Sequence, residues 1–141
     1  MRGLEGLIRL HKWRLDEKRQ VLAELERLAA RLRQELLDLE REVVNEQKVA
    51  AASPEAMAGY GQYANAVIVR RSTLTQSLSE VEERMRGALD AVTLAFRELK
   101  KYELVKARRD KTAQEQEKRQ QQAVLDELGL TLYRRQEESL G

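Results

Sequence analysis

Apolar residues recur along the first third of the chain at alternating steps of four and three. From Leu4 to Val43 this spacing marks twelve positions, and ten of them are apolar. A repeat of 3.5 residues keeps one stripe of a helix facing a partner helix. The pattern therefore predicts a long helix over about residues 3–50. We call these positions the first seam: Leu4, Ile8, His11, Leu15, Lys18, Leu22, Leu25, Ala29, Leu32, Leu36, Leu39 and Val43.

A second run with the same spacing begins at Ala64 and ends at Tyr102. Eleven of its twelve positions are apolar, and Arg71 is the exception. We interpret Arg71, like His11 and Lys18, as a structural residue of its seam. Beyond Tyr102, five of the next eight positions at this spacing are polar. The second seam is Ala64, Val67, Arg71, Leu74, Leu78, Val81, Met85, Ala88, Val92, Ala95, Leu99 and Tyr102.

The two runs are separated by signals for a turn. Ser53 can cap a new helix, and Pro54 fits its first position, where no backbone N–H is needed. We place the turn at about residues 51–54 and a second helix at about 55–137. Gly59 and Gly61 follow closely, so a bend at 59–61 remains an alternative.

A short connection makes the two helices antiparallel neighbours. Folding the chain at residue 52 pairs residue i with about residue 105 minus i, so Leu4 meets the region of 101 and Leu39 that of 66. The second helix is then unpaired beyond about residue 105, where the apolar pattern is also lost. The sequence predicts an all-α fold: one coiled-coil domain over 1–141, an antiparallel hairpin whose second helix extends past the first.

The composition favours helices and argues against a catalytic or metal-binding site. Ala, Glu, Lys, Arg and Leu make up 83 of the 141 residues, and there is one proline. With no cysteine, one histidine and no glycine-rich phosphate loop, we expect no metal site, no cofactor and no enzymatic activity. The longest aliphatic run is Val67–Val69, too short to span a bilayer. We therefore expect a soluble, cytoplasmic protein.

The net charge is only +2, but the predicted hairpin concentrates basic residues at its open end, where the first helix begins. Residues 2–19 and 97–111 become neighbours there, with a local charge of about +7. This charge is interpreted either as a solvated surface or as a surface for an acidic protein, a phospholipid layer or nucleic acid. The basic residues are Arg2, Arg9, Lys12, Arg14, Lys18, Arg19, Arg97, Lys100, Lys101, Lys106, Arg108, Arg109 and Lys111.

Three further features are candidates for partner contacts. Trp13 points away from the seam by its heptad position, in a chain with few aromatic residues. Tyr60 and Tyr63 flank the turn, where they either cap the coiled coil or bind a partner. A late apolar set either folds on itself, self-associates or docks on a partner. It comprises Val124, Leu125, Leu128, Leu130, Leu132 and Tyr133.

Several passages resemble one known family. The opening LEGLIRLHKWRLDEK (4–18), the charged ELKKYE (98–103) and the closing EKRQQQAVLDE (117–127) look like the FliJ family of flagellar export proteins. Length, hairpin position and the overlong second helix match as well. The resemblance implies a cytoplasmic, non-enzymatic adaptor of the bacterial flagellar type III export apparatus, a chaperone-like component of flagellum biogenesis and motility. It would lie peripherally at the membrane, as a monomer.

The resemblance also implies partners: the hexameric export ATPase, the export gate in the membrane, and export chaperones, but no nucleic acid. The gate end would include Tyr60, Tyr63 and Val67, although Gly59 and Gly61 soften this tip. A self-associating structural scaffold is the alternative, followed by a nucleic-acid or membrane-surface binder. The ATPase end would comprise Arg9, Lys12, Trp13, Arg97, Lys101, Arg108, Arg109, Leu125, Leu128 and Tyr133.

Overall fold

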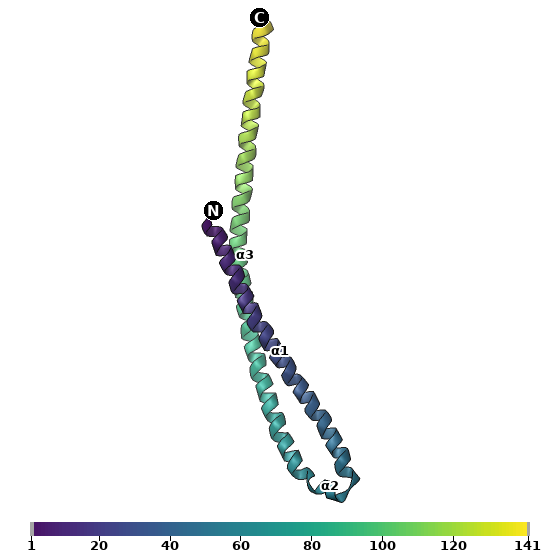
Figure 1. The fold of residues 1–141 in the computed structure, drawn as a ribbon. Helices are drawn as coiled ribbons and strands as arrows, with labels where there is room; N and C mark the ends of the chain where they lie inside the picture. The colour runs from purple at the N-terminus through teal and green to yellow at the C-terminus, as the bar shows by residue number, and fades with distance from the viewer. Residues whose placement is uncertain (1, 141) are drawn as a thin grey trace.

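The computed structural model describes residues 2–140, which form three helices: α1 (Arg2–Ala52), α2 (Pro54–Ala58) and α3 (Tyr60–Leu140). α1 and α3 run antiparallel, and α2 forms the bend between them (Figure 1). α3 continues well past the start of α1, so the C-terminus lies at the far end of a single projecting helix (Figure 1). The predicted all-α hairpin with a longer second helix is confirmed.

The buried side chains follow the two predicted seams. In the first seam only Lys18 is exposed, and in the second seam every position is buried or half-buried. No large side chain among the described residues is completely buried, because each helix covers only one face of its partner. Two clusters anchor the core: Ile8, Leu15 and Leu99 near the open end, and Leu39, Val67 and Leu74 near the bend.

The bend uses both of the turn signals in the sequence. Ser53 caps α2, since its Oγ accepts a hydrogen bond from the N–H of Ala56 at 3.1 Å, and Pro54 is the first residue of that helix. α2 ends after five residues at Gly59, and α3 starts at Tyr60. The single second helix expected from about residue 55 is therefore divided at Gly59, which is the C-cap of α2.

This longer bend changes which residues face each other. His11 was expected opposite residue 94, but its ring stacks on that of Tyr102, with centroids 4.7 Å apart. Likewise, the guanidinium of Arg71 lies 2.6 Å from the carboxylate of Glu40. The pairing is displaced by about one heptad from the expected one. The reason is that α2 adds residues to the connection and moves the midpoint of the hairpin beyond residue 52.

The remainder of α3, residues 107–140, is a free segment. Every one of its residues is exposed, and Lys106 is the last that is half-buried. At 1.5 Å per residue the free segment is about 50 Å long. Threonine hydroxyls bond back to its carbonyls, as from Thr112 to Arg108 and from Thr131 to Glu127, both at 3.0 Å. The start of α1 lies beside the first turns of this segment, where Leu4 and Glu5 line a shallow hollow with Asp110 and Ala113, but none of its own residues is buried in the core of the hairpin.

Two exposed glycines of α3 test the division of this helix into a part paired with α1 and a free segment. A Cβ added at Gly87 or at Gly129 meets nothing within 4 Å, and neither residue has a positive φ. Gly87→Ala, in the paired part, should raise the free energy of unfolding of the hairpin by about 0.5–1 kcal/mol, because alanine loses less backbone entropy in a helix. Urea denaturation followed by circular dichroism measures the change.

Gly129→Ala is the matched control in the free segment. It should leave the main unfolding transition where it is, because residue 129 is not coupled to the packed seam. An equal stabilisation by both substitutions would contradict the division of α3 into a paired part and a free segment.

Candidate functional site

The open end of the hairpin brings together the predicted basic residues from both helices. His11 and Tyr102 stack between α1 and α3 at this end and hold the helices in register. Around this pair, the side chains assigned to the ATPase end are all exposed. Trp13 is 59% exposed, as its heptad position indicates. These residues are Arg9, Lys12 and Trp13 on α1, and Arg97, Lys101, Arg108 and Arg109 on α3.

One further surface at the open end was missed by sequence reasoning. Phe96 and Leu104 are 42% and 57% exposed, and basic side chains of α3 surround them. The ammonium of Lys100 lies 5.5 Å from the centre of the Phe96 ring, within the range of a cation–π interaction. The heptad position of Leu104, opposite the seam, is the signal in the sequence that predicts its exposure.

The free segment presents apolar side chains in two groups. Leu125 and Leu128 are 61% and 55% exposed, and helical spacing places them with Val124 and Leu132 in an apolar stripe about 100° wide, with Val124 at one edge and Leu125 at the other. We call these four residues the distal stripe. Tyr133, also assigned to the ATPase end, is 59% exposed but lies outside this face, on the side of Leu130. The structure therefore does not bring Tyr133 together with Leu125 and Leu128.

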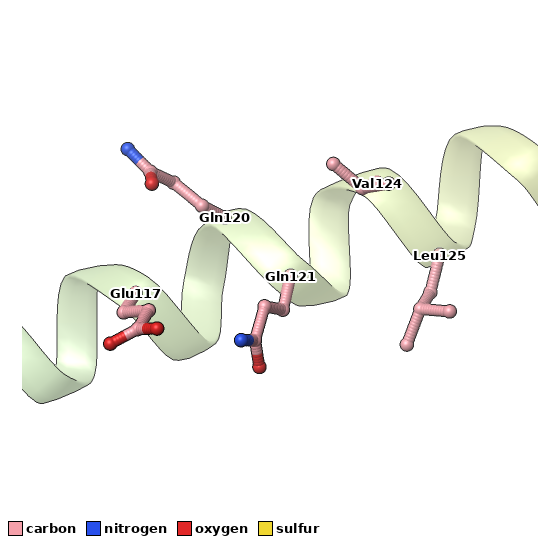
Figure 2. Close-up of a pocket in the computed structure, with 5 residues that line it drawn as sticks. All are labelled: Glu117, Gln120, Gln121, Val124 and Leu125. Atoms are coloured by element: carbon pink, nitrogen blue, oxygen red, sulfur yellow. The ribbon is translucent and has the colours of Figure 1, made fainter.

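On the turns of α3 that precede the distal stripe, the helix carries polar side chains. Figure 2 shows Gln120 and Val124 projecting from one side of α3, and Gln121 and Leu125 from another. All residues that line this shallow hollow, including Glu117, come from α3 itself. It is thus an open helix surface with no second wall, a shape that suits docking on another protein better than enclosing a small molecule.

The bend forms the other candidate surface, which we call the tip. The rings of Tyr60 and Tyr63 are 6.0 Å apart and tilted by 45°. Val67 is only 6% exposed and packs with Leu39 and Leu74, so this side chain belongs to the core. Its position in the second seam already predicts that burial. The next residues, Ile68 and Val69, are 60% and 67% exposed and offer the apolar surface instead.

Tyr63 has an unusual environment at the tip. Its hydroxyl oxygen is buried and has no hydrogen-bond partner in the described part of the chain. Burial raises the pKa of Tyr63 above its usual value, and the negative charges of Glu42 and Glu46 raise it further. A weak hydrogen bond to the Glu42 side chain also raises this pKa, although its geometry falls short of a regular hydrogen bond. An unpaired buried hydroxyl destabilises the closed tip.

The described residues offer no metal site. Within 2–140, no three side chains of the ligating types His, Cys, Asp or Glu are grouped so that they could hold an ion. The same range contains no helix with a stretch long and apolar enough to cross a membrane.

Comparisons with known proteins agree with the resemblance seen in the sequence. The family model for "Flagellar FliJ protein" matches residues 1–138. Curated relatives of that name from two strains of Caulobacter vibrioides are each 33% identical to this chain over 130 residues. Each alignment covers 89% of this chain and 90% of the relative. No solved structure matches.

Removing the hydroxyl of Tyr63 should stabilise the hairpin. Tyr63→Phe is expected to raise the urea midpoint, because phenylalanine fills the same space without an unpaired polar atom.

The raised pKa of Tyr63 adds a pH dependence. The protonated, neutral phenol is favoured in the folded state, so wild-type stability falls as pH rises above about 10, the pKa of unfolded tyrosine. The Tyr63→Phe variant should lose less stability in that range.

Tyr60→Phe is the control, since the hydroxyl of Tyr60 is not among the buried atoms without a partner. It should leave the urea midpoint nearly unchanged. If Tyr63→Phe instead lowers the midpoint, its hydroxyl has a stabilising partner and the description of the tip is wrong.

Proposed function

The chain belongs to the flagellar FliJ protein family, and on that basis we propose that it is a non-enzymatic adaptor of the flagellar type III export apparatus. In this proposal it binds the export ATPase through the open end and the free segment. It reaches the export gate, and export chaperones, with the rest of the hairpin. It acts in the cytoplasm, peripherally at the inner face of the membrane.

The observation that carries this proposal is the free segment. A helix that is exposed on all sides buries none of its own apolar residues, yet the distal stripe places four of them on one face. Exposed apolar groups clustered in this way indicate a surface that is covered by a partner. Leu125 and Leu128 lie within the distal stripe. The basic residues of the open end lie where the free segment leaves the hairpin.

The shape of the hairpin supports a mechanical role. The free segment and the tip lie at opposite ends of the molecule, joined by continuous helix (Figure 1). A partner held at the free segment and another held at the tip are therefore linked by one stiff lever. For the gate we propose Tyr60 and Tyr63 together with the exposed Ile68 and Val69, in place of the buried Val67.

Deletion of residues 114–141 tests the role of the free segment. The deletion keeps Ala113, which lines a hollow with Leu4 and Glu5 of α1, so the hairpin should stay folded. We expect the full-length protein to be a monomer that co-elutes with the export ATPase of the same organism, and the truncated protein to elute separately. Light scattering on a sizing column measures both, and circular dichroism reports folding.

A pair of double substitutions separates the distal stripe from general hydrophobicity. Leu125→Ser with Leu128→Ser should weaken ATPase binding at least about tenfold, because two side chains of one face are lost. Leu130→Ser with Leu140→Ser removes two exposed leucines outside the stripe and should have a much smaller effect. A stable dimer that ignores the ATPase would reject the adaptor and favour a self-associating scaffold.

A further inference from the structure

The outer face of α3 at the open end carries a regular row of residues. Arg97, Leu104 and Lys111 are seven residues apart and share the heptad position that points directly away from α1. At 1.5 Å per residue, this outward row is about 21 Å long. All three side chains are exposed. The row is flanked by Phe96, Lys100, Lys101 and Arg108.

The positive charge of this face is hardly neutralised. Within residues 2–140, Arg97, Arg108 and Lys111 form no ion pair, and Lys100 has only Glu103 at 3.9 Å. Seven residues of α3 line the hollow that runs from Phe96 to Arg108. Four of them are basic, three are apolar and none is acidic. An uncompensated row of cations attracts a negatively charged partner.

Two acidic residues of this part of α3, Glu98 and Asp110, lie on the side of α1. Glu98 lines a hollow with His11 and Arg14 of α1, and Asp110 lines another with Leu4. Between residues 96 and 111 the cations therefore collect on the outer face of α3, and Asp90, at the same heptad position one repeat before Arg97, marks the end of the cationic row toward the bend. The sequence of residues 97–111 has seven basic and three acidic residues, and the helix places most of the basic ones on the outer face.

The shape of the face indicates the kind of anionic partner. Every residue that lines it comes from α3, so it is convex and has no second wall to form a groove for a partner helix. Phe96 and Leu104 are exposed among the cations. A helix surface with four or more Lys and Arg and interspersed apolar residues is typical of binding to anionic lipids.

We propose that this face binds an anionic phospholipid surface, with Lys and Arg on the headgroups and with Phe96 and Leu104 between them. The proposal deepens the peripheral membrane location of the proposed function and rests on it for its biological setting. Vesicle binding by the isolated chain requires neither the ATPase nor the gate, so failure of either proposal leaves the other testable.

The test is flotation of the full-length protein with vesicles. It should float with phosphatidylcholine vesicles that contain phosphatidylglycerol and stay behind with phosphatidylcholine alone, and added salt should weaken the binding. Arg97→Glu, Arg108→Glu and Lys111→Glu combined should reduce affinity at least about tenfold. No flotation of the wild type with anionic vesicles would overturn the proposal.

A matched triple variant controls for net charge. Arg41→Glu, Arg70→Glu and Arg84→Glu change three exposed arginines elsewhere on the hairpin, and both triples lower the net charge from +2 to −4. The control triple should retain most of the affinity. An equal loss in both triples would mean that overall charge alone drives binding, and the assigned face would be wrong.

A second pair of measurements distinguishes a bilayer from an acidic protein. Phe96→Ser with Leu104→Ser keeps every charge, and it should lower vesicle affinity while binding to soluble polyglutamate stays the same. If the double variant binds vesicles as tightly as the wild type does, or if the wild type binds polyglutamate but no vesicles, the face is a site for acidic polypeptides and the lipid proposal fails.

Discussion

The unequal length of two paired helices determines the rest of this structure. A seam residue of a two-helix coiled coil is removed from water only where the other helix faces it. α1 has 51 residues and α3 has 81, so α3 has no intramolecular partner once it passes the start of α1. The polar free segment follows from this limit, and the distal stripe is notable because it is apolar in a place where the chain itself supplies no cover.

The same seam explains why the helices could be predicted from the sequence and their alignment could not. Burial along a heptad pattern is a local property, and it follows the two predicted seams from Leu4 to Tyr102 at every position except Lys18. A shift of the partner helix by one heptad places apolar residues opposite apolar residues again, so the heptad pattern alone does not determine the register of the two helices. The register depends on the length of the bend. There the chain forms the short helix α2, which ends before Gly59, and helix propensity does not predict this break.

The candidate surfaces show the same contrast. The exposure of Trp13 and the basic open end follow from heptad position and could be predicted. The family resemblance places Val67 at the gate end, but its position in the second seam buries it in the core. The separation of Tyr133 from Leu125 needs the angular position of each residue on a continuous helix. The unpaired hydroxyl of Tyr63 needs atomic contacts and has no signal in the sequence.

A structure with one seam and no enclosed core has to act through its outer surfaces, and the seam also orients these surfaces. Trp13 holds the heptad position of α1 that points away from α3, and the outward row holds the same position on α3. The two therefore face in opposite directions at the open end. A protein bound on the Trp13 side alone would leave the cationic face of α3 accessible, whereas a protein that also covers Arg97 and Arg108 would compete with a lipid surface for that face.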